Sequence, residues 1–295
     1  MLILDGDLAE FAPAKVNLFL HVGARAPDGY HPIASLMAFA DVGDLLRLEP
    51  PNAAAFEMAG PFAGGIETGP GNLVVRARDS FVRMARLSEQ FRLVLEKNLP
   101  VAAGLGGGSA DAAATLRLLN RAFPRLDERQ LLELAAELGA DVPACLTSQP
   151  LLAEGWGKQI SPAPHLPELP CVLVNPGIPS ATADVFAAYD RSSPRAANRP
   201  DMPLAFKDPQ ALVRFLVECR NDLEQPAIER APQIAGALEV LREAPHCRLA
   251  RLSGSGATAF GLCDTTLAAQ QLAAEVMAHQ PRWWVRACVL RGSGA

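Results

Sequence analysis

Four glycines fall within five positions, at residues 104–108, and they constrain this chain more than any other feature. Glycine loses more conformational freedom on folding than any other residue, so such a cluster needs a reason, either a positive φ or a close approach to the backbone. The preceding segment 91–96 alternates as a strand does, and the following segment 112–119 is rich in Ala and Leu, as a helix is. The sequence therefore predicts a glycine loop between a strand and a helix N-terminus.

A helix N-terminus that follows glycines is suited to a phosphate group. Unpaired N–H groups and the positive end of the helix dipole converge there, and no Cβ atom keeps an anion away from the backbone. Two common phosphate loops are excluded. A P-loop needs Lys after the glycines, and the dinucleotide fingerprint needs glycine where Ser109 stands. A glycine-rich surface loop without a ligand remains the alternative.

Composition indicates an enzyme with real hydrophobic cores. A length of 295 residues favours about two domains, and 49% of the residues are hydrophobic. The net charge of −5 argues against a nucleic-acid partner. The six cysteines are widely spaced, and we find neither a signal peptide nor a membrane-spanning run. We therefore expect a cytoplasmic protein without a membrane partner, and the oligomeric state stays open.

The first fifty residues carry four strand signals and one turn signal. The strands are expected at 8–11, 16–22, 33–39 and 44–48, and Pro27-Asp28-Gly29 is expected to turn the chain. Side chains alternate along a strand, so Lys15 and Asn17 should share one face. A solvated sheet surface is the simpler explanation for such a pair, and an active-site face is the other.

Helix and strand signals continue along the chain. Helices are expected at 72–89, from Asp127 to Gly139, after Asp208-Pro209 and at 265–279. The Pro-rich segment 161–170 is predicted to link two domains, and strands are expected at 171–177 and 283–290. The Gly254–Gly256 turn is followed by strand-like residues 260–263, which excludes a Rossmann loop because a helix should open there.

The run from Pro100 to Ala110 resembles the phosphate-binding motif of the GHMP small-molecule kinases. Three further stretches resemble family motifs in the family's order: 13–20 with 28–31, 138–143 and 249–260. The resemblance covers nearly the whole chain. It implies an α+β fold in two domains, an N-terminal ATP-binding domain at 1–160 and a C-terminal substrate-side domain at 161–295, with the active site in the cleft between them.

The resemblance also implies roles for particular residues. Lys15 and Asp141 would be catalytic, with Lys15 keeping Asp141 ionised and offsetting charge on the transferred group. ATP and Mg²⁺ would be the cofactors, and Ser109 is a candidate Mg²⁺ contact. The ATP phosphates would lie against Pro100, Val101, Ala102, Ala103, Gly104, Leu105, Gly106, Gly107, Gly108, Ser109 and Ala110.

Within the GHMP kinases, the run 13–20 followed by Asp28-Gly29-Tyr30-His31 resembles the members that phosphorylate the 2-hydroxyl of 4-diphosphocytidyl-2-C-methyl-D-erythritol in non-mevalonate isoprenoid synthesis. The implied partner is a small cytidine diphosphate derivative. Its binding would involve Asn17, Tyr30 stacked on the cytosine, His31 hydrogen-bonded to the base, and Phe186 on the opposite side. Another alcohol as substrate, or a catalytically idle nucleotide-binding module, remain the alternatives.

Several residues allow more than one interpretation. Without the resemblance, Asp141 would be a cap or turn carboxylate, Tyr30-His31 a turn, and Phe186 the core side of a short helix. Lys97 is either a solvated lysine at a strand end or a nucleotide contact. Asp111 stands where many family members have Asn, which leaves open whether it faces the nucleotide directly, through Mg²⁺, or not at all. The stretch 221–224 also resembles the family and is interpreted as structural.

Overall fold

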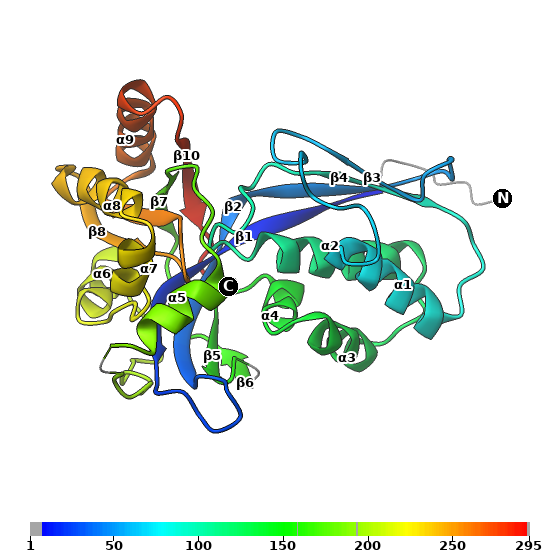
Figure 1. Ribbon diagram of the computed structural model, residues 1–295, viewed down its shortest axis with the longest axis horizontal. Coiled ribbons are helices and arrows are strands. Elements are labelled where there is room, and N and C mark those ends of the chain that lie inside the picture. Colours follow the sequence, from blue (N-terminus) through cyan, green and yellow to red (C-terminus); the bar gives the residue numbers. More distant parts are fainter. Residues whose placement is uncertain (1–7, 158, 193, 294–295) are drawn as a thin grey trace. The chain divides into compact units, whose positions relative to one another are not determined.

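The computed structural model describes residues 8–157, 159–192 and 194–293 (Figure 1). The strands are β1 (Leu8–Val22), β2 (Ile33–Glu49), β3 (Phe56–Ala59), β4 (Arg92–Glu96), β5 (Leu151–Gly155), β6 (Gln159–Pro162), β7 (Leu169–Asn175), β8 (Cys247–Leu252), β9 (Ala259–Cys263) and β10 (Trp284–Leu290). The helices are α1 (Leu73–Ala85), α2 (Gly107–Ala122), α3 (Glu128–Leu138), α4 (Val142–Thr147), α5 (Thr182–Tyr189), α6 (Pro209–Val217), α7 (Glu224–Arg230), α8 (Gln233–Glu243) and α9 (Thr266–His279). The mixed helix and strand content confirms the α+β prediction.

The chain forms two compact units that are interleaved in sequence. Unit 1 contains residues 8–14, 43–101 and 106–148. Unit 2 contains 15–42, 102–105 and the chain from 149 onward. The Pro-rich segment 161–170 lies inside unit 2. The predicted division at residue 160 concerns family domains, whereas these units are defined by contacts between residues. The predicted domain boundary therefore stays a prediction.

Unit 1 packs helices against a small sheet (Figure 1). Strand β4 pairs in parallel with β3, and its Leu95 lies opposite Leu46 of antiparallel β2. Helix α2 contacts α1, α3 and α4, and most of its side chains are small and buried. Asp127 and Gln130 form the reciprocal capping box at the start of α3. These contacts hold the N-terminus of α2, which follows the glycine loop, in a fixed place within unit 1.

Unit 2 is built on the antiparallel strand order β10-β7-β9-β8. Helix α9 packs on β10, β7 and β9, and α8 packs on β8 and β9. Val172, Leu238, Leu241 and Leu272 belong to one buried hydrophobic cluster of this unit. Strand β5 pairs with β2 and with β6. The turn between β8 and β9 contains the second glycine motif, so the core of unit 2 positions that turn.

The four strands expected near the N-terminus are two long strands, β1 and β2, so the predicted breaks are wrong. Residues 12–22 are all buried, which covers both faces of β1 and lets the extended backbone continue through Pro13. Strand β2 continues through Gly43, where a Cβ atom would lie 2.2 Å from the carbonyl oxygen of Ala12. Pro13 and Gly43 lie in the gaps between the expected strands, and tertiary packing continues each strand through them.

Most other predicted elements are confirmed, with shifted ends. Helix α1 ends at Ala85 rather than near 89, because Arg86 adopts the left-handed conformation with φ of 49°. Asp208 caps α6 by accepting from the N–H of Ala211, and Thr265 caps α9. The short helix α4 was not predicted, because six residues starting with Val-Pro carry too little periodicity.

Candidate active site

The glycine loop ends at the N-terminus of α2, in unit 1. Gly106 is the N-cap with φ of 64°, and within the described chain no side chain caps the helix. The first N–H groups of a helix have no partner inside the helix. Ser109 is partly exposed in this first turn, whereas Ala110 is buried. The predicted combination of uncapped helix N-terminus and left-handed glycine is therefore present, and its geometry suits an anion.

The preceding part of the loop, residues 102–105, belongs to unit 2 and is fixed there by backbone hydrogen bonds. The carbonyls of Ala103 and Leu105 accept from the N–H groups of Thr258 and Lys15, at 3.1 and 2.8 Å. Gly104 has φ of 74°, and a Cβ atom on it would lie 2.2 Å from the carbonyl oxygen of Ser253. The serine hydroxyl in turn donates to the carbonyl of Gly104. Only glycine fits against this turn.

A ligand at the glycine loop would contact mainly backbone groups, because several of the loop's side chains are buried. Ala103 and Leu105 are buried, Pro100 is buried, and Val101 is 51% exposed. Ala102 has φ of 51°, in the left-handed region that non-glycine residues rarely adopt. The Gly254 turn packs against the same loop, because a Cβ atom on Gly254 would lie 3.2 Å from the carbonyl oxygen of Gly104.

Lys15 and Asn17 share a face of β1, as their spacing predicts. The ammonium of Lys15 donates to Asn17 Oδ1 at 2.8 Å, and Asn17 Nδ2 donates to the hydroxyl of Ser35 at 2.8 Å. The Asn17 N–H donates to Ser253 Oγ at 3.2 Å. Lys15 is 5% exposed and Asn17 2%, so the solvated-surface explanation is wrong. The side-chain amide of Asn17 therefore orients the ammonium of Lys15.

Asp141 lies in unit 1 at the N-cap position of α4. Its backbone is in the right-handed region, and in the described structure its side chain makes no capping hydrogen bond. The side chain is partly exposed. The cap interpretation is therefore wrong, although the residue stands where a cap would. Pro143 lies in the first turn of α4 and has no backbone N–H, so one of the groups that a cap would bind is missing. The helix can therefore begin here without a capping side chain.

His31 and Phe186 lie together in unit 2. Their ring centroids are 4.8 Å apart, and His31 Nε2 lies 2.6 Å from Asp190 Oδ1. Tyr189 meets the same imidazole edge-on at 5.9 Å. Tyr30 is 68% exposed beyond the Pro27–Gly29 turn. Sequence reasoning missed Tyr189, the last residue of α5, and Asp190, its C-cap, although spacings of three and four from Phe186 place all three on one face.

A buried ionic cluster lies next to the N-terminus of α2 and was not predicted. Lys97, 4% exposed, donates to Asp44 and, at 2.9 Å, to Asp111. Asp44 also accepts from the N–H groups of Asn98 and Leu99. The interpretation of Lys97 as a solvated lysine is therefore wrong, whereas a contact with a nucleotide stays a prediction. Asp44 shares the buried face of β2 with Leu46 and Leu48, and a carboxylate on an apolar face could have signalled a partner.

Asp111 faces this cluster. Burial, opposed in part by Lys97, raises the pKa of its carboxyl to about 7. Its Oδ1 has no hydrogen-bond partner among the described residues. Gly107 makes room for the cluster, because a Cβ atom there would lie 3.0 Å from Lys97 Nζ. Asp111, the fifth residue of α2, therefore joins this helix to Lys97, which directly follows β4.

The stretch 221–224 is structural, as predicted. Asn221 Nδ2 donates to the carbonyls of Leu252 and Gly254, at 2.9 and 2.8 Å. Glu224 accepts from the N–H of Leu252 at 2.9 Å. These bonds fix the entrance of the glycine turn between β8 and β9.

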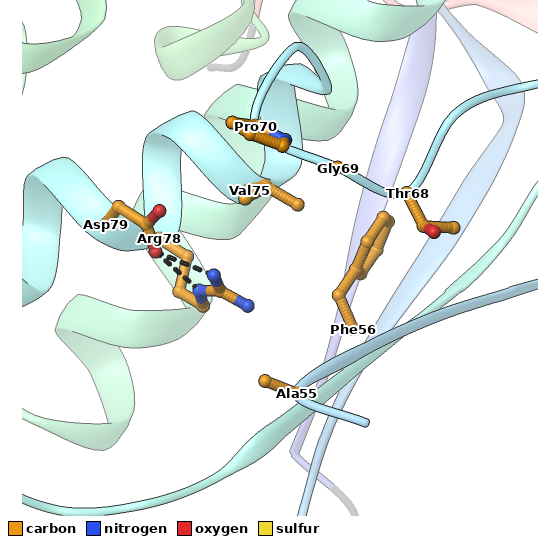
Figure 2. Close-up of a pocket in the computed structure, with 8 residues that line it drawn as sticks. All are labelled: Ala55, Phe56, Thr68, Gly69, Pro70, Val75, Arg78 and Asp79. Carbon is orange, nitrogen blue, oxygen red and sulfur yellow. Dashed lines mark hydrogen bonds and ion pairs between the residues drawn. The ribbon is translucent and has the colours of Figure 1, made fainter. Parts of the chain in front are cut away.

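A pocket of about 360 Å³ opens in unit 1 beside α1. Figure 2 shows Phe56 on one side, with Pro70, Val75 and the Arg78–Asp79 ion pair on the other. Its remaining lining residues are Ala55, Thr68 and Gly69. None of the catalytic or binding residues predicted from the sequence lines this pocket.

Metal and membrane features are limited in the part of the chain that the structure describes. No group of three or more His, Cys, Asp or Glu side chains there could hold a metal ion. An Mg²⁺ ion carried by nucleotide phosphates needs only one or two protein oxygens, so the partly exposed hydroxyl of Ser109 fits that role. None of the described helices combines the length and apolarity needed to cross a bilayer.

Comparison with known proteins identifies two matching family models. The model described as the GHMP kinases N terminal domain matches residues 72–149, and the GHMP kinases C terminal model matches residues 205–281. The first includes the glycine loop and Asp141.

A Caulobacter vibrioides protein (strain NA1000 / CB15N) named 4-diphosphocytidyl-2-C-methyl-D-erythritol kinase is 52% identical over 287 residues, covering 96% of this chain and 99% of its own. A crystal structure of 4-(cytidine 5'-diphospho)-2C-methyl-D-erythritol kinase is 33% identical, with a TM-score of 0.77 over 96% of this chain and all of that one. Homoserine kinase from Cytophaga hutchinsonii, 17% identical, shares the fold with a TM-score of 0.69, covering 99% of this chain and 97% of its own.

Proposed function

The chain belongs to the GHMP kinase family, and within it to the 4-diphosphocytidyl-2-C-methyl-D-erythritol kinases, and we propose that it transfers the γ-phosphoryl group of ATP to the 2-hydroxyl of 4-diphosphocytidyl-2-C-methyl-D-erythritol. This is the kinase step of the non-mevalonate isoprenoid pathway. The observation that carries the proposal is the uncapped N-terminus of α2 after the glycine loop. An idle binding module would not need Lys15 to be oriented in a buried network.

The glycine loop would hold the ATP phosphates. Phosphoryl transfer requires mainly alignment and charge stabilisation from the protein. The N–H groups of Gly107, Gly108 and Ser109 lie in the first turn of α2, where the helix dipole favours an anion. Mg²⁺ bound to the nucleotide and to Ser109 would neutralise charge on the phosphates. The buried ionic cluster of Lys97, Asp44 and Asp111 supports this turn from inside unit 1.

Lys15 and Asp141 would serve the chemical step. Asp141 would accept the proton of the substrate hydroxyl or orient that hydroxyl for in-line attack. Lys15 would offset charge that develops on the transferred phosphoryl group. Asn17 holds the ammonium of Lys15 by the 2.8 Å hydrogen bond, so we assign Asn17 a positioning role as well as the predicted contact with substrate.

Tyr30, His31 and Phe186 would bind the cytosine. The exposed phenol ring of Tyr30 offers a face for stacking, and Phe186 already packs against His31. Asp190 holds Nε2 of His31, which leaves Nδ1 to pair with the edge of the base. This arrangement would select a pyrimidine, whereas homoserine or mevalonate would gain nothing from it.

A cytoplasmic location is part of the proposal. All six cysteines are free thiols in the described structure, including the five buried ones at Cys145, Cys171, Cys219, Cys263 and Cys288. Thiols are kept reduced in the cytosol, which fits six free cysteines.

The reaction is tested by ADP release from ATP and Mg²⁺ in the presence of 4-diphosphocytidyl-2-C-methyl-D-erythritol, mevalonate or homoserine. We expect turnover with the cytidyl substrate alone. Turnover with another alcohol would keep the kinase and reject the cytosine site. ATP binding without turnover on any of the three would favour the binding module.

The catalytic roles are tested by Lys15→Ala and Asp141→Ala. Each should lower kcat by at least about 100-fold, since a positioned proton acceptor or charge typically contributes that much, while ATP affinity is largely kept. Lys207→Ala and Asp201→Ala remove exposed charges and serve as matched controls. Near wild-type turnover in either catalytic variant would refute its assignment.

A further inference from the structure

Two cysteines face each other across the β8–β9 ladder of unit 2. Cys247 opens β8 and Cys263 ends β9, and the two residues are antiparallel partners next to a register shift between Cys247 and Leu249. Directly opposite residues have Cβ atoms about 4.5–5.5 Å apart, and a disulfide joins Cβ atoms about 3.5–4.5 Å apart, so a small local shift brings the two sulfurs within bonding range. Gly261 adds space on the same face, because a Cβ atom there would lie 2.9 Å from Cys247 Sγ. The sulfur of Cys247 therefore lies over β9.

The two thiols differ in exposure and in acidity. Cys247 is partly exposed, and Cys263 is 6% exposed within the hydrophobic cluster of unit 2. The Cys263 thiol beside it lowers the pKa of Cys247, and the neighbouring Arg248 guanidinium lowers it further against the effects of burial and Asp264. The Cys247 sulfur and burial raise the pKa of Cys263, whose thiol donates to the carbonyl of Gly261 at 3.8 Å. Cys247 is thus the better nucleophile, and Cys263 is held next to it as a protonated thiol.

We propose that Cys247 and Cys263 are a redox-active pair that a hydroperoxide oxidises to a cross-strand disulfide. The Cys247 thiolate attacks the peroxide, the O–O bond breaks, and Cys247 becomes a sulfenic acid while the leaving oxygen departs as hydroxide. The Cys263 sulfur then attacks the Cys247 sulfur, the S–O bond breaks, and the Cys263 proton leaves with the oxygen as water. Two thiols lose two electrons, and hydrogen peroxide is reduced to water.

A second cysteine pair in the same sheet provides an internal control. Cys171 of β7 and Cys288 of β10 are also direct antiparallel partners. Both are buried, at 0% and 5% exposure, and burial together with Cys288 raises the pKa of Cys171. This pair matches Cys247 and Cys263 in strand pairing but lacks the exposed, more acidic member. It should therefore stay reduced when the first pair reacts.

The disulfide would close the open end of the β8–β9 hairpin. The other end of this hairpin is the Gly254–Gly256 turn, which packs against Gly104. Oxidation would therefore restrain the hairpin that supports residues 102–105 of the glycine loop. This inference concerns thiol chemistry and stands whether or not the kinase substrate is the one proposed above.

The test uses the full-length reduced protein, treated with a small excess of hydrogen peroxide, alkylated and analysed by intact mass and non-reducing peptide mapping. We expect the loss of two hydrogen atoms and one linked peptide pair containing Cys247 and Cys263. Cys171→Ser should behave as wild type. Cys263→Ser should accumulate a sulfenic acid on Cys247 that dimedone captures, and Cys247→Ser should form neither product.

A disulfide at Cys171–Cys288 instead, or no mass loss under these conditions, would overturn the proposal. So would a Cys263→Ser variant whose Cys247 takes up no dimedone. Circular dichroism establishes that each serine variant is folded. If a variant fails to fold, the wild-type peptide map decides the question alone, because the two candidate pairs lie in different peptides.

Discussion

Replacing Asp111 by Asn should make the stability of the protein less dependent on pH. Asp111 shares the buried cluster with one cation, Lys97, and a second carboxylate, Asp44, so its ionised form leaves the cluster with a net negative charge. Burial is the main reason that the pKa of Asp111 rises from 3.8 to about 7. In the variant, a neutral amide could still accept from Lys97 and would donate to Asp44.

The direction of the effect follows from proton binding. Between pH 4 and pH 7, folded Asp111 keeps a proton that the unfolded chain has released, so unfolding releases a proton and wild-type stability falls as pH rises. At about 1.4 kcal/mol for each pH unit, a pKa of 7 against 3.8 implies a loss of roughly 2.5 kcal/mol between pH 5 and pH 8. Lys97 stays charged over this range in the wild type, because Asp111 and Asp44 raise its pKa against the effect of burial, and Asp44 remains as its carboxylate partner in the variant.

The assay is urea unfolding of the ligand-free protein at pH 5, 6, 7 and 8. The free energy of unfolding of Asp111→Asn minus that of wild type should rise by roughly 2.5 kcal/mol across the series, most steeply below pH 7. Asp201→Asn, which changes an exposed carboxylate, should give a flat difference. A flat difference for Asp111→Asn as well would refute the assignment of a raised pKa to Asp111.

Three further substitutions test the supporting structure. Gly104→Ala should lower the free energy of unfolding by about 2 kcal/mol or more and raise KM for ATP, because the new Cβ atom meets the carbonyl of Ser253 at a positive φ. Gly64→Ala is the control: open space surrounds Gly64, so this variant should be neutral in both assays. Asp44→Ala should cost about 3–5 kcal/mol in urea unfolding, since it leaves a buried ammonium and two N–H groups short of an acceptor. Asp127→Ala should cost about 1 kcal/mol by losing the cap of α3 without changing kcat, and a change in kcat would contradict a purely local role.

Local signals predicted many elements because their causes lie within a few residues. The capping box at Asp127 and Gln130 needs only a helix start, and Asp208 followed by proline likewise begins α6 where expected. The strand-turn-strand pattern around Gly254 correctly excluded a dinucleotide fold. Breaks within β1 and β2 were predicted wrongly, because pairing and burial along the whole strand outweigh one proline or one glycine.

In the candidate site, too, contacts between near neighbours in the chain were predicted from the sequence, and contacts between distant residues were not. Period-2 geometry alone placed Lys15 beside Asn17, and the 2.8 Å hydrogen bond confirms that placement. No local pattern could pair Lys97 with Asp44, because 53 residues separate them and the contact arises only when β2 and β4 align. The catalytic and cytosine-binding roles remain proposals that the activity assays above decide.

By itself, the sequence determined the glycine loop at a helix N-terminus, the family, and the alternation that brings Lys15 to Asn17. These depend on backbone geometry and on motifs that survive in a linear chain. Tertiary structure decided that Lys97 is buried, that Asp111 turns to the cluster, and that His31 meets Phe186 and Asp190. Such contacts join residues far apart in the chain, and their energies depend on burial, which only the packed fold creates.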